Sequence, residues 1–192
     1  MSNIFILDNL DSLTYNIAEE LRVYGHNVHI HRNDSREEEI YNLIMNIKDP
    51  ILLLSPGPGI PLKAGCMMKI IKKFSKKIPI LGICLGHQAI IEYFNGTIKK
   101  SKSILHGRSS LIFHDNKFMY KNISNPLKVS RYHSWICDKI PKSFIINACY
   151  KNIVMSIRHN KHKICSFQFH PESILTIHGN ILLKNTIKWL SE

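Results

Sequence analysis

The feature that most constrains this chain is a cysteine that stands between two glycines after a short apolar run. Residues 78–81 are apolar, and Gly82, Cys84 and Gly86 follow directly. A G-x-C-x-G frame at the end of a strand predicts a sharp strand-to-helix turn that presents the central side chain at the sheet edge. A side chain at position 82 or 86 would collide with the neighbouring turn, and glycine also tolerates unusual backbone angles.

The helix expected after this turn gives the thiol a chemical role. Unpaired backbone N–H groups and the positive end of the helix dipole favour negative charge on the sulfur of Cys84. The pattern therefore predicts a nucleophile. On these residues alone a buried structural cysteine in a strand-to-helix turn stays open as the alternative.

Apolar runs alternate with helical patterns through the first half of the chain. Strand-like runs lie at residues 3–7, 27–31, 50–54 and 78–81, and helical spacing occurs at 13–24, 37–47, 66–77 and 86–95. Asp11 or Ser12 is expected to cap the first helix. This alternation predicts an open, mostly parallel twisted sheet with helices on both faces. Shorter runs at 111–113, 128–132, 144–148 and 153–157 predict a smaller antiparallel part, and a strand at 163–169 and a helix at 179–190 close one α/β domain of 192 residues.

Composition excludes several classes of function. The net charge of +12 comes from scattered lysines without interleaved aromatic residues, so nucleic acid binding is not expected. Five cysteines without a C-x-x-C pair argue against a disulfide framework or a zinc knuckle. No HExxH or similar spacing occurs among the histidines, and no catalytic metal is expected. With no signal peptide and no apolar stretch long enough for a membrane, we expect a cytoplasmic protein.

A histidine and a glutamate follow the strand-like run at 163–169. His170 and Glu172 are two residues apart, so their side chains can point to the same side of an extended backbone, and Pro171 stiffens the link between them. A carboxylate beside a histidine fixes its tautomer, and such a histidine can take a proton from a thiol. A zinc deaminase also uses H-x-E, but the P-C-x-x-C that it needs is missing. Alone, such a pair is more often a surface pair than a catalytic dyad.

Four polar loops follow strand-like runs and are therefore expected at one edge of the sheet. They are residues 8–12, 55–59, 84–86 and 170–172. In the second loop Pro56 and Pro58 have no N–H, so Ser55, Gly57 and Gly59 supply its donors. This loop could bind an oxyanion or be a rigid turn. Together the loops predict acyl transfer through a thioester, with the substrate still open.

Three motifs together resemble those of the class I, or triad, glutamine amidotransferases. They are Ser-Pro-Gly-Pro-Gly at 55–59, Gly-Ile-Cys-Leu-Gly-His-Gln at 82–88 and Phe-Gln-Phe-His-Pro-Glu at 167–172. Residues 8–14, 105–107 and 131–134 resemble the branch that serves chorismate-using synthases, and within it the amidotransferase subunits of anthranilate synthase. The resemblance implies that Cys84 attacks the side-chain amide of glutamine, that His170 shuttles protons and that Glu172 orients His170.

The resemblance also implies a substrate pocket. Backbone N–H groups of Gly57 and Leu85 would hold the oxyanion, with Pro58 and Gly59 in the same loop. Gln88, Ser134 and Trp135 match positions that hold L-glutamine in this family. Trp135 stands where a smaller apolar residue is usual, Leu13 where phenylalanine is usual and Arg108 where lysine is usual.

A partner is implied as well. Ammonia would pass to a separate chorismate-binding synthase subunit, anthranilate synthase component I, in a hetero-oligomer of the tryptophan pathway. No cofactor is expected in this chain, and magnesium is expected on the partner. Docking is expected at two loops, with Asn9, Asp11 and Ser12 in one and His106, Gly107 and Arg108 in the other.

Three alternatives remain. The sister subunit of aminodeoxychorismate synthase, in folate synthesis, has the same chemistry, and one subunit could serve both pathways. A non-catalytic regulatory subunit would have no need of Cys84, His170 and Glu172 together. An independent hydrolase or cysteine peptidase would turn over without a partner.

Overall fold

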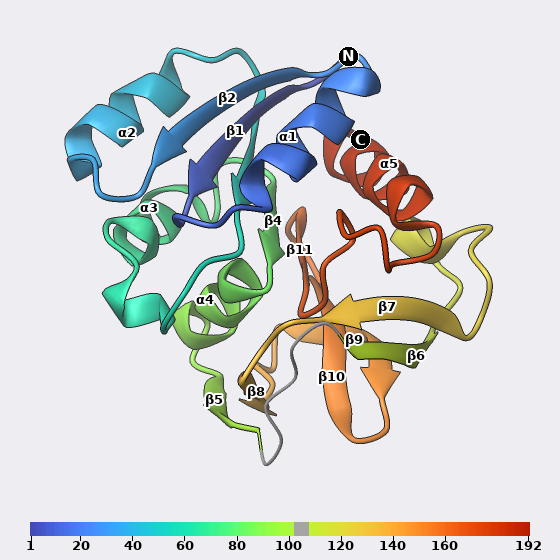
Figure 1. Ribbon diagram of the computed structural model, residues 1–192. Helices are drawn as coiled ribbons and strands as arrows, with labels where there is room; N and C mark the ends of the chain where they lie inside the picture. Colours follow the sequence, from blue (N-terminus) through green and yellow to red (C-terminus); the bar gives the residue numbers. More distant parts are fainter. Residues whose placement is uncertain (102–107) are drawn as a thin grey trace.

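One large sheet organises the molecule (Figure 1). The computed structural model describes residues 1–101 and 108–192. The strands order as β2-β1-β3-β4-β11-β10-β9-β6-β7, and the first five run parallel. These five are β1 (Asn3–Asp8), β2 (Asn27–Arg32), β3 (Pro50–Leu54), β4 (Ile80–Ile83) and β11 (Ile164–Phe167). The strand order reverses between β1 and β3, which places a switch point at this edge of the sheet.

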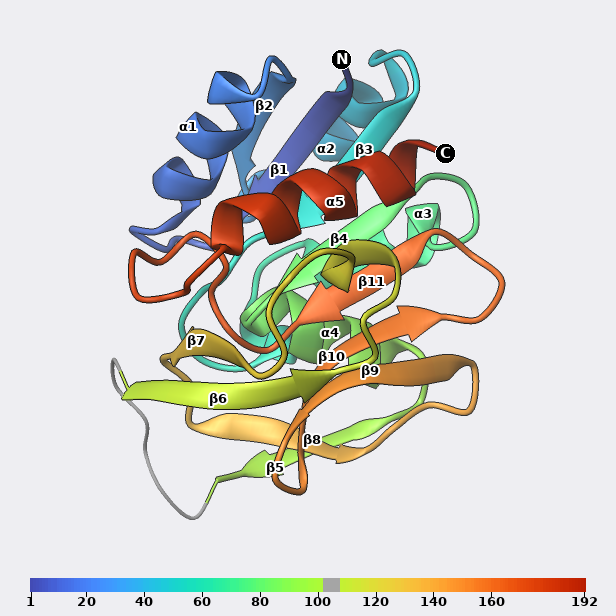
Figure 2. The same cartoon turned by 90° about the vertical axis from the view of Figure 1, so that its right-hand side faces the viewer.

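Helices cover both faces of the parallel part (Figure 2), as predicted. Helices α1 (Thr14–Val23) and α5 (Gly179–Ser191) pack on one face, and α2 (Glu37–Met45), α3 (Met67–Phe74) and α4 (Leu85–Tyr93) pack on the other. Alternate residues of β1 divide between the two cores: Ile4 and Ile6 contact the α1 and α5 side, and Phe5 and Leu7 the opposite side. Strands that are buried on both faces explain the continuous apolar runs in the sequence.

The antiparallel part continues the same sheet. It consists of β10 (Ile153–His159), β9 (Phe144–Tyr150), β6 (Arg108–His114) and β7 (Leu127–Arg131). Two further strands, β5 (Thr97–Lys100) and β8 (Trp135–Lys139), pair with each other in a separate ribbon. Short 3-10 turns lie at η1 (Pro61–Lys63) and η2 (Phe118–Tyr120). The sequence did not predict β5, because three of its four residues are exposed and polar.

The start of α1 differs from the prediction. Leu13 is the N-cap residue and no side chain caps the helix, so the assignment of this role to Asp11 or Ser12 was wrong. The carboxylate of Asp8 organises the turn instead, since its Oδ1 accepts bonds from the Leu10 N–H at 3.0 Å and the Thr14 hydroxyl at 2.8 Å. Oδ1 of Asp11 accepts the N–H of Leu13 at 2.8 Å, and the backbone carbonyl oxygen of Asp11 accepts the N–H of Thr14 at 3.2 Å.

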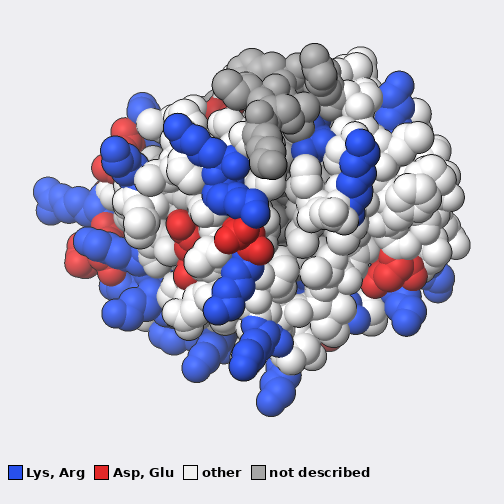
Figure 3. All heavy atoms as spheres, turned by 90° about the horizontal axis from the view of Figure 1, so that it is seen from below, with Lys and Arg blue, Asp and Glu red and all other residues white. Residues whose placement is uncertain are grey.

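The surface carries its positive charge in a dispersed form. Figure 3 shows Lys and Arg side chains spread over the lower face, with Asp and Glu side chains among them. Within residues 1–101 and 108–192, no helix has both the length and the apolar character to cross a membrane.

Candidate active site

The turn at Cys84 has the strained geometry of a nucleophile elbow. Cys84 adopts φ 52° and ψ −99° and immediately precedes α4. A Cβ on Gly82 would lie 2.6 Å from the backbone of Gly86, and a Cβ on Gly86 would lie 2.3 Å from the carbonyl oxygen of Leu54. The glycines are therefore needed for close approach, as predicted, whereas the positive φ falls on the cysteine itself. Backbone strain of this kind is typical of functional sites.

Strand pairing brings the predicted base to the nucleophile. The backbone N–H of Cys84 donates to the carbonyl oxygen of Phe167 at 2.8 Å, which joins the ends of β4 and β11. His170 follows three residues later, and its Nδ1 lies 2.6 Å from Oε1 of Glu172, with both side chains buried. A carboxylate only accepts, so Nδ1 carries the proton and Nε2 is the nitrogen left to interact with Cys84.

Electrostatics favour a protonated His170. Burial by itself disfavours the charged imidazole, but the interactions with Cys84 and Glu172 outweigh it and raise the pKa of His170 well above its ordinary value. A protonated imidazole in this place can give a proton to a departing amine.

The predicted substrate residues surround one small cavity. Its volume is about 130 Å³, and Cys84 and His133 are among the residues that line it. The predicted residues in its lining are Gly57, Pro58, Gly59, Leu85, Gln88, Ser134 and Trp135. The side-chain amide of Gln88 donates to the carbonyl oxygen of Trp135 at 3.2 Å, and Nδ1 of His133 lies 3.0 Å from the same oxygen. The fold thus assembles every residue that the resemblance assigned to glutamine, although the roles themselves are not tested by this geometry.

Asn9 holds the loop that carries Gly57 through two hydrogen bonds. The Asn9 N–H donates to the Ser55 hydroxyl and its side-chain amide to the Ser55 carbonyl, both at 2.8 Å. A Cβ on Gly57 would lie 2.5 Å from the carbonyl oxygen of Asn9. Asn9 is 2% exposed, so its side chain does not fit the predicted contact with a partner. Its position indicates that it braces the loop at residues 55–59.

Of the other predicted interface residues, the structure describes Asp11, Ser12 and the backbone of Arg108. Ser12 is exposed and Asp11 is half-buried in the loop before α1. Arg108 begins β6 and pairs with Arg131 of β7, whereas His106 and Gly107 lie outside the described residues. Contact of these residues with a partner stays a prediction.

Two neighbours of the triad received no role from the sequence. Gln168 is fully buried, and its side-chain amide lies 4.0 Å from the sulfur of Cys84. The ring of Tyr132 stands edge-on to His170, with ring centroids 5.2 Å apart. Gln168 precedes His170 by two residues, and this spacing, which places both on one side of an extended chain, is the signal that could have identified it.

No metal centre is evident in the part of the chain that the structure describes. No group of three or more His, Cys, Asp or Glu side chains there could hold an ion. The expectation that magnesium belongs to a partner stays a prediction.

Known proteins are similar to this chain in sequence and in fold. A model of the family described as "Glutamine amidotransferase class-I" matches residues 5–189. The chain belongs to the class I glutamine amidotransferases. Anthranilate synthase component 2 of Haemophilus influenzae is 50% identical to this amidotransferase over 190 residues, which are 99% of this chain and 98% of the relative. Anthranilate synthase component 2 of Buchnera aphidicola from Schizaphis graminum is 53% identical over 191 residues, 100% of this chain and 97% of the relative.

A solved structure agrees with the fold of this amidotransferase. A Thermoplasma acidophilum protein that is described as part of a GMP synthase superposes with a TM-score of 0.86 and 25% identity, over 99% of this chain and 94% of that one. The mostly parallel sheet with an antiparallel extension is therefore confirmed as the fold class.

Proposed function

We propose that this amidotransferase is the glutamine-hydrolysing subunit of an anthranilate synthase and supplies ammonia to a chorismate-binding partner. Relatives with the name anthranilate synthase component 2 align with it over almost their whole length at about half identity, which supports this assignment over aminodeoxychorismate synthase. The observation that carries the chemistry is the strained Cys84 elbow, which lines a small cavity and interacts with His170 of the buried His170–Glu172 pair.

The first step is attack of the Cys84 sulfur on the side-chain carbonyl carbon of L-glutamine. His170 already holds the proton given up by the Cys84 thiol, so the sulfur attacks as a thiolate and the carbonyl oxygen becomes an oxyanion. Leu85 is the first residue of α4, so its N–H has no partner within the helix. Gly57 supplies the N–H between two prolines. These two donors bind the oxyanion, while Gln88, Ser134 and Trp135 hold the rest of the substrate.

The second step breaks the carbon–nitrogen bond. His170 gives its proton to the departing nitrogen, ammonia leaves, and a thioester joins Cys84 to the glutamyl group. Water then attacks the thioester, and His170 removes a proton from the water. The carbon–sulfur bond breaks, which releases glutamate and frees the sulfur of Cys84. Glu172 holds the Nδ1–H of His170 throughout, which keeps Nε2 on the reacting side.

The ammonia is used by another chain. Component I, the synthase subunit, binds chorismate and the magnesium that the reaction needs, and it forms anthranilate and pyruvate. The two chains form a hetero-oligomer so that ammonia moves between them without release to water.

Reconstitution with the synthase subunit from the same organism tests this function. Wild-type protein should give glutamine-dependent anthranilate, while Cys84→Ser should lower that activity by at least about 10³-fold and leave the use of free ammonia intact. Cys149→Ser is the matched control, because Cys149 is another free thiol and does not line the cavity. Normal glutamine use by Cys84→Ser would overturn the mechanism. Aminodeoxychorismate as the product would overturn the pathway.

A further inference from the structure

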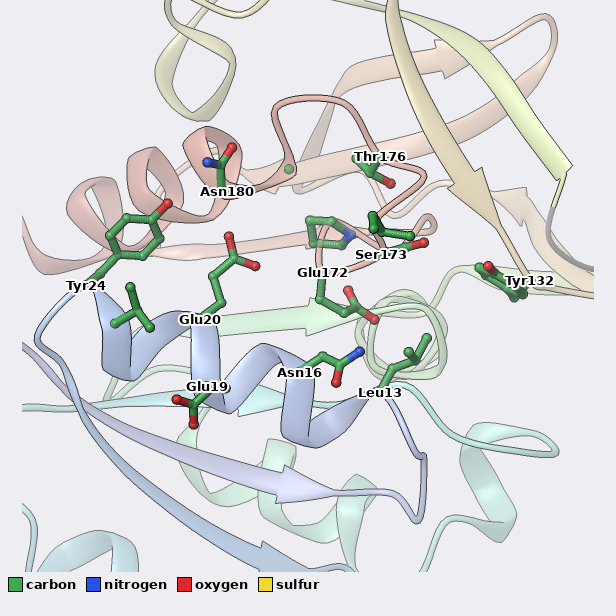
Figure 4. Close-up of a pocket in the computed structure, with 14 residues that line it drawn as sticks. Leu13, Asn16, Glu19, Glu20, Tyr24, Tyr132, Glu172, Ser173, Thr176 and Asn180 are labelled. Carbon is green, nitrogen blue, oxygen red and sulfur yellow. The ribbon is translucent and has the colours of Figure 1, made fainter.

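A second, larger hollow adjoins the catalytic cavity. It has a volume of about 710 Å³ and runs between α1 and residues 171–180, and we call it the Glu20 groove. Figure 4 shows Asn16 and Glu20 projecting from α1 toward the facing segment, from which Glu172 projects back. Tyr132 lines both the groove and the catalytic cavity, so the two are neighbours.

The charge of this groove is opposite to that of the whole chain. The chain has 26 Lys and Arg residues against 14 Asp and Glu. Among the described residues that line the groove there are three glutamates, Glu19, Glu20 and Glu172, and no Lys, Arg or His. Lys184 of α5 lies 5.9 Å from the ring centroid of Tyr24, which lines one end of the groove. The groove is therefore a local anionic site on a cationic protein.

Among the residues that the structure describes, Glu20 lacks a positive neighbour, and Glu172 has one, His170, on only one of its two oxygens. Glu19 pairs loosely with Arg22 at 4.0 Å, but Glu20 has no ion pair with any residue in the described ranges. Glu172 uses Oε1 for His170, and its buried Oε2 has no hydrogen-bond partner within the same ranges. Burial, and then the charge of Glu172, raise the pKa of Glu20. A cation between them would satisfy both.

An apolar rim borders the acidic lining. Ile174 is 98% exposed and Val23 is 75% exposed, and both line the groove. The loop that presents Ile174 is held firmly, because the Thr176 hydroxyl donates to the carbonyl oxygen of His170 at 2.6 Å and the Ile177 N–H donates to that of Lys128 at 3.0 Å. A rigidly held and nearly fully exposed isoleucine beside an acidic hollow is typical of a protein interface.

We propose that the Glu20 groove receives a lysine or arginine side chain of the synthase subunit, which pairs with Glu20 while an apolar residue of that subunit covers Ile174. This inference rests on the proposed function, because that function supplies the partner. Charge complementarity selects a basic side chain as the occupant. Docking there puts a positive charge next to the Glu172 carboxylate, so partner binding and the His170–Glu172 pair are physically connected.

Charge reversal in the reconstituted complex tests the proposal. Glu20→Lys should raise the dissociation constant for the synthase subunit by at least about 10-fold, and Glu20→Gln by about 3-fold, with a weaker dependence on salt for both. Glu38→Lys is the matched control, since Glu38 is an exposed glutamate on α2, which packs on the opposite face of the sheet. Ile174→Asp should weaken association by a similar factor without a change in charge at Glu20. Thermal unfolding of each variant alone verifies that it folds.

The outcomes separate this proposal from the proposed function. If Glu20→Lys associates as tightly as wild type while the wild-type complex makes anthranilate, the groove is not the docking site and the function stands. If Glu38→Lys weakens association as much as Glu20→Lys, general charge explains the effect and the groove proposal is wrong. If the wild-type chain does not associate with the synthase subunit, both proposals fail.

Discussion

Tyr132 lines both the catalytic cavity and the Glu20 groove, yet different structural elements form the rest of each site. The cavity, at about 130 Å³, is formed largely by loops at the carboxyl ends of β3 and β4 and by the segment before β8. The groove, at about 710 Å³, is formed by side chains of α1 and by a loop that packs across from it. Backbone that is fixed by a sheet positions reacting atoms closely, whereas helix side chains offer charge and apolar surface to a partner. Glu172 lines the groove and also holds His170 of the catalytic triad.

Glu172→Gln should separate the two regions most strongly. The neutral amide no longer stabilises a protonated His170 or fixes its tautomer, so glutamine-dependent turnover should fall by about 10²- to 10⁴-fold. Association with the synthase subunit should change by less than about 3-fold, because Glu20 keeps its charge. Steady-state kinetics and a binding titration on one preparation measure both, with Glu38→Gln as control. Loss of association with normal turnover would reverse the assignment of Glu172.

Gly86→Ala should damage the frame of the cavity and leave the groove intact. The added Cβ would lie 2.3 Å from the Leu54 carbonyl oxygen, so backbone must shift, and we expect a loss of about 3 kcal/mol in the free energy of unfolding. Gly25→Ala is the control, because Gly25 has φ +82° and nothing within 4 Å of a Cβ, and only conformational strain of about 1 kcal/mol applies. Urea unfolding compares the variants. Equal costs would mean that close packing at the elbow is not what requires glycine.

Acid should lower the stability of the fold through a buried histidine of α4, the helix that follows Cys84. His87 is fully buried in α4, its Nδ1 lies 2.8 Å from the Ser166 hydroxyl, and burial followed by the charge of His133 lowers its pKa to about 3. The unfolded chain takes up this proton below about pH 6.5 and the folded chain does not, so stability falls as pH falls. The His87 contribution between pH 7 and pH 5 should be about 2 kcal/mol.

The variant His87→Gln isolates the contribution of His87 to the pH dependence of stability. His133, whose pKa burial and then Arg131 lower to about 4, adds a loss of the same sign. His87→Gln should therefore reduce the pH dependence of the unfolding free energy without removing it. Urea unfolding at pH 7 and pH 5 measures the difference between the variant and wild type. An unchanged slope in the variant would show that His87 is not the group that acid protonates on unfolding.

Much of the cavity could be predicted from sequence because each of its parts obeys a local rule. A strand that is buried on both faces gives a continuous apolar run in the sequence. Strand β3 is an example, and it spans residues 50–54 as expected. The carboxyl ends of parallel strands meet at one edge, so the residues that follow these runs had to converge. The glycine frame then fixed which side chain is presented.

The groove and the supports of the loops could not be predicted in this way. Glu20 looks like an ordinary helix-surface glutamate, and only the packing of α1 against the C-terminal segment places it opposite Glu172. Asn9 looks like an exposed loop residue, yet Ser55 and Asn33 satisfy its side chain inside the protein. Such contacts join residues that are distant in sequence, and no periodicity or local motif encodes them.

The position of β11 has a consequence for the newly made chain. This strand enters the sheet between β4 and β10, and the bond from the Cys84 N–H to Phe167 is made across that seam. A ribosome delivers the thiol long before it delivers β11 and His170, and pairings between such distant segments form slowly. The nucleophile therefore stays without its base until the last strand is inserted, so the nascent chain cannot hydrolyse glutamine before its sheet is complete.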